Sequence, residues 1–127
     1  MPDWIVTKPS PRSVPDTVSR LSELLAAKGV KLFTVIDHSG EAAAHGLELR
    51  DTKVVVFGSP VAGTPVMQAA PLAALDLPLK ILVWDDDGQT HVSYTPPAEL
   101  GARYGLSDEL SARLAAIDGL TDALVEG

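Results

Sequence analysis

The chain has 127 residues, of which 46% are hydrophobic and 21% charged, and this composition excludes a disordered tail and favours one globular domain. The net charge of −7 argues against a nucleic-acid partner, because a phosphate backbone would be repelled. The absence of cysteine excludes disulfides and thiolate metal sites. We expect a single domain over residues 1–127 that is cytoplasmic, without a signal peptide or a membrane span.

The N-terminal part is expected to hold a short strand and a long helix. The apolar run Trp4–Thr7 is typical of a strand, which the following prolines end because proline cannot donate to a strand ladder. Ser13 is an N-cap residue by type, and Gly29 is a natural C-terminal stop. Between them an apolar stripe recurs at helical spacing, made of Val14, Val18, Leu21 and Leu25.

Two more strands and a Gly/Pro-rich connection follow. The stretches Val30–Asp37 and Lys53–Phe57 are rich in β-branched residues and each predict a strand. Glu41–His45, between them, predicts a brief helical turn. The pair Thr64–Pro65 is expected to open the next helix, because proline needs no hydrogen-bond donor at a first helical position, and Pro71 to kink or split it.

A β-hairpin is the strongest local prediction. Leu79–Trp84 predicts a strand, and Asp87-Gly88 after it is a two-residue hairpin turn by type. In that register Trp84 faces His91 across the two strands. The core face of the hairpin then carries Ile81, Val83, Val92 and Tyr94. The opposite face carries Leu82, Trp84, His91 and Ser93, and a partner subunit is the favoured cover for it.

The C-terminal part is expected to be helical. Ala98–Tyr104 can form a short helix, and Ser107 is expected to cap a final helix with Leu110, Leu114 and Ile117 on one stripe. Gly119 should weaken or break that helix, leaving a tail that frays or makes one more turn. The order of elements is no regular strand–helix alternation. It predicts an α+β fold, with one mostly antiparallel sheet and helices on one face.

Several ordered motifs resemble one family of known proteins. They are Thr34-Val35-Ile36-Asp37-His38, Gly46-Leu47-Glu48-Leu49, Phe57-Gly58-Ser59-Pro60, Ala62-Gly63-Thr64-Pro65-Val66-Met67-Gln68, Leu75-Asp76-Leu77-Pro78-Leu79-Lys80 and Val83-Trp84. Together they resemble the family of domains of unknown function numbered 302, over roughly Ser13 to Leu106. The resemblance implies a fold like one half of the TATA-binding protein, with a curved antiparallel sheet, and a homodimer. It supplies no reaction and no catalytic residues.

One candidate site is a metal centre made by His38, Glu41 and His45. Glu41 and His45 are four residues apart and would share a helix face, and two imidazoles with a carboxylate are a known ligand set for zinc or iron. The spacing matches no established metal signature. The simpler interpretation, which we favour, is that Glu41 stabilises the helix start and His45 the helix end, while His38 closes a strand.

A second candidate is a ligand site around Gly58, Gly63, Thr64 and Met67. A helix opening at Gly63–Thr64 would offer free N–H groups to an anion, and the glycines would let a ligand approach the backbone. The simpler alternative is ordinary capping by Thr64, with Met67 as a core residue. A third candidate is the hairpin face with Trp84 and His91.

Two hypotheses from different classes follow. The first is a homodimeric binding module without catalysis or cofactor, which takes a small anionic or apolar ligand, or a partner protein, between the sheet and the Thr64–Leu75 helix or at the dimer seam. The alternative is a small metal-dependent enzyme that uses the His38, Glu41 and His45 set. An interaction scaffold without a pocket is a third possibility.

Overall fold

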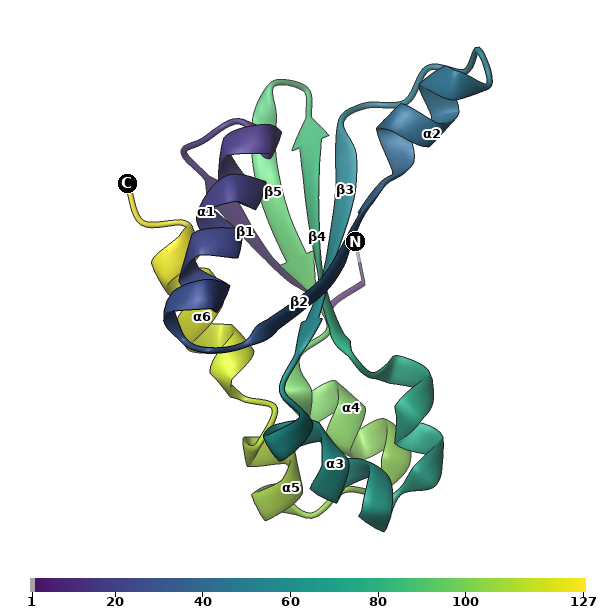
Figure 1. Cartoon of the computed structure of the whole chain (residues 1–127), viewed down its shortest axis with the longest axis vertical. Helices are drawn as coiled ribbons and strands as arrows, with labels where there is room; N and C mark the ends of the chain where they lie inside the picture. The colour runs from purple at the N-terminus through teal and green to yellow at the C-terminus, as the bar shows by residue number, and fades with distance from the viewer. Residues whose placement is uncertain (1) are drawn as a thin grey trace.

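The computed structural model describes residues 2–127, which form one antiparallel sheet and several helices (Figure 1). The sheet has five strands in the order β1-β5-β4-β3-β2, and every neighbouring pair is antiparallel. The strands are β1 (Val6–Ser10), β2 (Lys31–Asp37), β3 (Thr52–Gly58), β4 (Leu79–Asp86) and β5 (Gln89–Tyr94). The helices are α1 (Val14–Ala27), α2 (His38–Ala44), α3 (Pro60–Ala69), the 3₁₀ helix η1 (Pro71–Asp76), α4 (Pro97–Tyr104), α5 (Asp108–Ala112) and α6 (Ala116–Leu124). Within the described residues no helix is long and apolar enough to cross a membrane.

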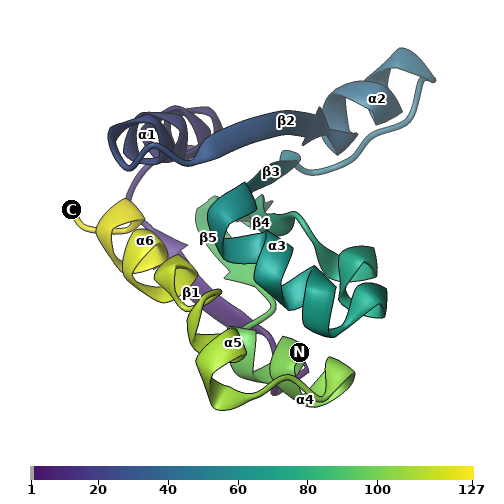
Figure 2. The same ribbon diagram turned by 60° about the horizontal axis from the view of Figure 1, so that its bottom comes forward.

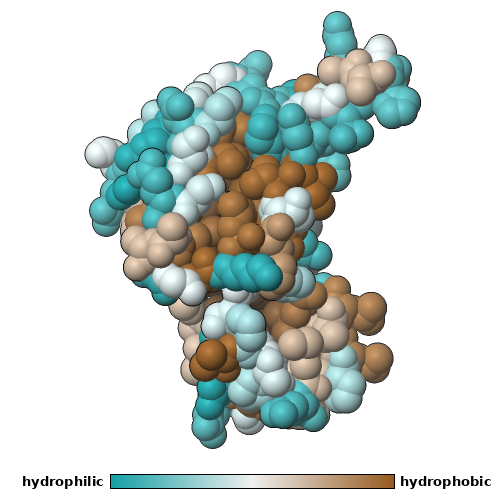
Figure 3. Space-filling view, in the orientation of Figure 1, coloured by the Kyte–Doolittle hydropathy of each residue, from teal (hydrophilic) through white to brown (hydrophobic). Residues whose placement is uncertain are grey.

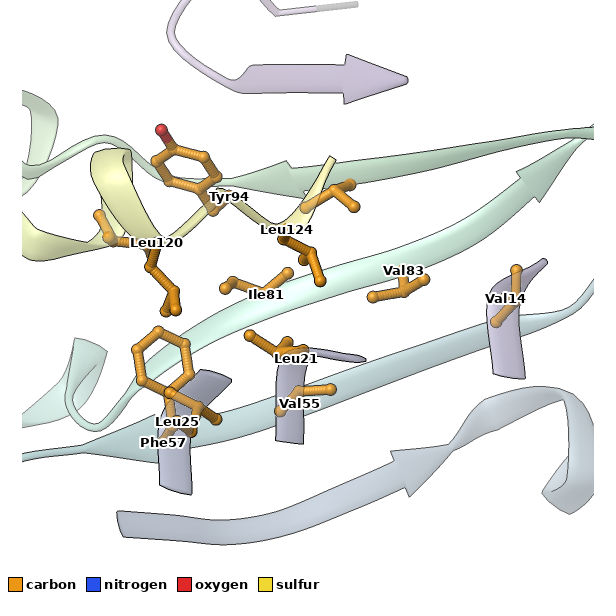
Figure 4. Packing of buried hydrophobic residues seen from close by; sticks show 12 residues of the cluster. Val14, Leu21, Leu25, Val55, Phe57, Ile81, Val83, Tyr94, Leu120 and Leu124 are labelled. Atoms are coloured by element: carbon orange, nitrogen blue, oxygen red, sulfur yellow. The ribbon is translucent and has the colours of Figure 1, made fainter. Parts of the chain in front are cut away.

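The main core lies between one face of the sheet and the helices α1 and α6. Figure 4 shows α1 and α6 side chains meeting the side chains of β3, β4 and β5. The fully buried members include Leu21, Leu25, Val55, Ile81, Val83, Val92 and Leu124. Alternation along each strand explains this, because every second side chain points to the same face. The α+β fold with helices on one face is therefore confirmed.

The β4–β5 hairpin has the predicted turn and register. Asp87 and Gly88 both have positive φ angles, of 54° and 93°, as a type I′ turn requires. Trp84 pairs with His91, and Val83 with Val92. The two faces of the hairpin are consequently divided as the sequence predicts.

Polar contacts fasten the ends of the chain to the core. The Lys8 ammonium on β1 donates to the Thr121 hydroxyl at 2.7 Å and to the Asp122 carboxylate at 2.8 Å, both on α6. Burial opposes the charge of Lys8, but hydrogen bonding and charge interactions with Asp122 and Tyr94 together outweigh it and raise the Lys8 pKa. Ser10 and Thr17, both buried, bond to each other at 2.8 Å. The Lys8 bonds hold β1 to α6, from the opposite end of the chain, and the Ser10–Thr17 bond holds β1 to α1.

A second group of helices packs beyond one end of the sheet. In Figure 1, α3, α4 and α5 lie together below the strands. Their common core contains Val66, Ala73, Leu100 and Leu114. The Asp76 carboxylate at the end of η1 accepts hydrogen bonds from the Tyr104 hydroxyl and, at 2.9 Å, from Arg103. The Tyr104 bond, supported by Arg103, lowers the pKa of Asp76 against the opposing effect of burial.

The two edge strands differ. The prolines near β1 do not end it as predicted, since β1 continues through Pro9 to Ser10; an edge strand tolerates a residue without an N–H group. All seven residues of β2 are exposed, including the apolar Leu32, Phe33, Val35 and Ile36. Beyond β2, helix α2 projects away from the rest of the molecule (Figure 2).

Three helix boundaries differ from the sequence prediction. Helix α2 begins at His38, because the Asp37 carboxylate accepts the Gly40 N–H at 2.9 Å and caps it. Helix α3 begins at Pro60, not at Thr64, so Pro65 lies inside it.

The third difference is the C-terminal end. Ser107 caps α5 as predicted, but the helical structure is interrupted at Arg113–Ala115 and not at Gly119. Gly119 lies within α6, which buries Ile117, Leu120, Thr121 and Leu124 against the sheet. The apolar contacts of this stripe outweigh the cost of about 1 kcal/mol that a glycine carries inside a helix.

Candidate functional site

An open apolar hollow of about 270 Å³ lies where the sheet meets the second group of helices. Its walls come from four parts of the chain. They include Phe33, Phe57 and Leu79 from the sheet, Gly63, Thr64 and Met67 from α3, Leu77 and Pro78 from the segment before β4, and Leu114, Ile117 and Leu120 from the C-terminal helical region. In Figure 3 a broad hydrophobic area occupies the middle of the molecule around β2 and the neighbouring strands.

The crossing from β3 into α3 shapes one side of this hollow. A Cβ atom added at Gly58 would lie 3.3 Å from the Pro78 Cβ and 3.5 Å from the Phe33 ring. Glycine therefore lets these two side chains approach the end of β3. The register of β2 shifts at the bulge between Leu32 and Thr34, so Phe33 escapes the strict alternation and lines the hollow.

The α3 wall has a space that a side chain could occupy. A Cβ atom added at Gly63 would meet one neighbour within 4 Å, the Met67 terminal methyl at 3.9 Å. Met67 is half-buried, and its flexible thioether chain suits an irregular surface.

The predicted anion site at Gly63–Thr64 is not at a helix N-terminus. Because α3 begins one turn earlier, the Ala62 and Gly63 N–H groups already donate to the Ser59 carbonyl at 3.1 and 2.8 Å. Thr64 sits inside the helix and does not cap it. The residues predicted here line the hollow, but by a different geometry from the one the sequence suggested.

Two basic side chains, Lys28 and Arg113, are the charged members of the hollow's lining. Lys28 follows the last residue of α1, and Arg113 follows the last residue of α5. A cation is favoured at such a position, since unpaired carbonyls point from a helix C-terminus. The lining carries no Asp, Glu or His among the residues that the structure describes.

Trp84 and His91 lie on the opposite face of the sheet and do not join the hollow. The Trp84 indole N–H donates to the Ser93 hydroxyl at 3.0 Å, and its ring lies 5.1 Å from the His91 ring. The Arg50 guanidinium sits 6.0 Å from the Trp84 ring centre. The His91 Nδ1 is buried and has no hydrogen-bond partner among residues 2–127. Both side chains are half-buried.

The structure does not bring His38, Glu41 and His45 together as a metal centre. Within the described part of the chain, no three His, Cys, Asp or Glu side chains are placed to hold a metal ion. The His45 Nδ1 instead lies 3.0 Å from the Glu41 carbonyl oxygen, one turn back on α2. This contact is the helix-end role that the simpler interpretation expects for His45.

The profile of the family described as "Domain of unknown function DUF302" matches residues 6–124. The chain belongs to the DUF302 family. A crystal structure of an uncharacterized conserved DUF302 protein from Bacillus stearothermophilus superposes with a TM-score of 0.82 and covers 98% of this chain and 97% of that one. At 19% sequence identity this likeness establishes the fold alone.

Curated relatives of this DUF302 chain include longer proteins. It is 35% identical over 112 residues to the fluoride-specific ion channel FluC 1 of Brucella suis biovar 1 (strain 1330), covering 86% of this chain and 44% of that protein. It is also 35% identical over 112 residues to FluC 1 of Brucella abortus biovar 1 (strain 9-941), covering 42% of that protein. The chain spans less than half the length of these relatives.

Sequence reasoning missed most of the lining of the hollow in this DUF302 protein. Phe33, Leu120, Lys28 and Arg113 come from segments far apart in the chain, and no local motif links them. One signal was available: the continuous apolar run around Phe33 lacks strict alternation, which indicates a strand that does not simply divide into a core face and a solvent face.

Proposed function

We propose that this DUF302 chain is a non-catalytic binding module that holds a small ligand in the hollow and works as a homodimer. The hollow itself is the observation that carries the proposal. Folded domains ordinarily fill such space, because interiors pack as densely as organic crystals. A volume of about 270 Å³ lies just below the range of typical ligand pockets, which begins at roughly 300 Å³. The fitting ligand therefore has one to three rings or a short chain.

The chemistry of the lining supports binding and not catalysis. A catalytic site needs a nucleophile, or an acid and a base, placed on the reacting atoms. The lining is mostly apolar, and its titratable groups in the described chain are one lysine and one arginine at its margin. The partial match to longer proteins also supports a module, because a similar region there is joined to other sequence.

The test fills the hollow without weakening the fold. Gly63→Leu places a side chain in the open space beside Met67, and leucine is the better helix former. Gly119→Leu is the matched control, because Gly119 is also inside a helix but has nothing within 4 Å. Binding of N-phenyl-1-naphthylamine, a neutral apolar fluorophore, is titrated against all three proteins.

We expect the wild type and Gly119→Leu to bind the fluorophore alike, and Gly63→Leu to bind at least about tenfold more weakly, a loss of about 1.4 kcal/mol. Equal binding by all three proteins would place the fluorophore elsewhere. No binding by the wild type would contradict a small-ligand role.

The homodimer is proposed to form through β2. Its seven exposed residues run along the edge of the sheet, and an edge strand of this kind is a template for pairing with another chain. In a two-fold antiparallel pair centred on Thr34, Lys31 of one copy faces Asp37 of the other, and Leu32 faces Ile36. The strand is thus complementary in charge and apolar character to a second copy of itself.

Thr34→Lys tests this pairing, because it places two like charges directly opposite each other at the centre. Size-exclusion chromatography with light scattering should give a dimer for the wild type and a monomer for Thr34→Lys. Val61→Lys is the control, since Val61 is an exposed apolar residue that belongs to α3 and not to β2.

A monomeric wild type at micromolar concentration would refute the dimer. A dimer lost in Trp84→Glu but kept in Thr34→Lys would move the interface to the opposite face of the sheet. For a dimeric wild type, the two variants thus decide between an interface along β2 and one that covers the Trp84 indole.

A further inference from the structure

The charged residues that line the hollow have the opposite sign to the chain as a whole. The chain has 17 acidic and 10 basic residues, so acidic neighbours would be expected around a surface opening. The two charged residues in the lining, Lys28 and Arg113, are both basic. An apolar hollow with basic residues at its margin, in an otherwise acidic protein, would direct an anionic ligand to the hollow, because the remaining surface repels anions.

Neither cation is used by the protein itself. Ion pairs engage Lys8, Arg20, Arg50, Lys53 and Arg103, whereas Lys28 and Arg113 have none within residues 2–127. Both are held near the hollow by their positions directly after α1 and α5. Their charges are therefore available to a bound molecule.

We propose that the ligand is a small amphipathic carboxylate, whose apolar body fills the hollow while its carboxylate meets Arg113 and Lys28 at the margin. This inference rests on the proposed function and specifies its ligand class. Arginine matches a carboxylate with two parallel N–H donors, and lysine adds a point charge. A phosphate would gain from further donors at a helix N-terminus, but the Ala62 and Gly63 N–H groups at the start of α3 are already bonded to Ser59.

The experiment compares three probes with the same eight-carbon chain: octanoate, octanol and octyl phosphate. Each is titrated as a competitor of the bound fluorophore N-phenyl-1-naphthylamine at pH 7. For the wild type we expect octanoate to bind about tenfold more tightly than octanol, as a charge-assisted hydrogen bond predicts. The preference should shrink as salt is raised from 0.05 to about 0.5 M, because exposed charges are screened.

Two variants test whether Arg113 and Lys28 cause the preference for octanoate over octanol. Arg113→Gln should lower octanoate affinity about tenfold and leave octanol affinity unchanged, and Lys28→Gln should do the same to a smaller extent. Arg20→Gln is the control, because Arg20 lies on α1 outside the lining and pairs with Glu23 at 3.7 Å.

The outcomes separate the ligand class from the proposed function. Equal affinity for octanoate and octanol, or tighter binding of octyl phosphate, would overturn the carboxylate while the hollow still bound apolar probes. Octanoate preference that survives in Arg113→Gln and Lys28→Gln would overturn the assignment to this margin. If neither the fluorophore nor any of the competitors binds the wild type, the proposed function fails as well.

Discussion

One face of the sheet is densely filled over most of its length and hollow at one end. In the filled part, Leu21, Ile81, Val83 and Leu124 are fully buried under α1 and α6. At the end formed by Phe57 and Leu79, the same face opens into the hollow. Helix α6 spans both parts, with Leu124 in the filled part and Leu120 beside the hollow. The stability of the domain is thus concentrated in one part, and the other part is free to take a ligand.

The largest loss of stability is expected from a substitution in the filled part of the core. Leu21→Ala removes a fully buried side chain and leaves a cavity that rigid neighbours cannot close. We expect the free energy of unfolding to fall by about 2–5 kcal/mol, measured by urea denaturation. A loss below 1 kcal/mol would mean that this part of the core is as loosely packed as the hollow.

A smaller loss of stability is expected when Asp76, which holds one wall of the hollow in place, is replaced. Asp76 holds the end of η1 to α4 through Tyr104 and Arg103, directly before Leu77, which lines the hollow. Asp76→Ala should lower the free energy of unfolding by about 1–3 kcal/mol, as expected for hydrogen bonds to a charged group. It should also weaken fluorophore binding, whereas Leu21→Ala should leave binding by the folded protein unchanged.

The contribution of Asp76 should depend on pH. Its pKa is lower in the folded protein than in the unfolded chain, where it is about 3.9. The stabilisation is therefore complete above the unfolded pKa and is lost as pH falls through the folded value. The difference in unfolding free energy between the wild type and Asp76→Ala should be constant from pH 5 to pH 8 on this account and shrink below about pH 4. A difference that grew on acidification would contradict the assigned direction.

The smallest effect is expected in the wall of the hollow. Met67→Ala removes a flexible side chain that faces open space and so loses few contacts. We expect the free energy of unfolding to change by less than about 1 kcal/mol, while affinity for an apolar fluorophore changes measurably. A loss as large as that of Leu21→Ala would erase the distinction between the two parts of the face.

Sequence reasoning succeeded where local rules are strong. The alternation around Val83 and the Asp87-Gly88 turn determine the hairpin register, because a slip by one residue would move every side chain to the other face. Ser13 and Gly29 bound α1 for a similar reason, since both residue types satisfy a specific helix end.

It failed where two local signals compete or where distant segments meet. Ser59–Pro60 and Thr64–Pro65 are equivalent as helix starts by residue type, and the structure uses the first of them. Gly58, Gly63, Thr64 and Met67 could be grouped as one candidate site because they lie in one segment of the sequence. Their separation from Trp84 and His91 could not be predicted, because no local pattern states which sheet face a helix will border.

Pro9 in β1 affects how many copies of the chain could assemble into one continuous sheet. Two copies paired along β2 would leave only β1 strands at the outer borders of the combined sheet. Each border carries Pro9, which lacks a donor, and Lys8, which is turned toward α6. A further strand would meet an edge with one donor missing. Growth of the sheet beyond two copies would thus be disfavoured.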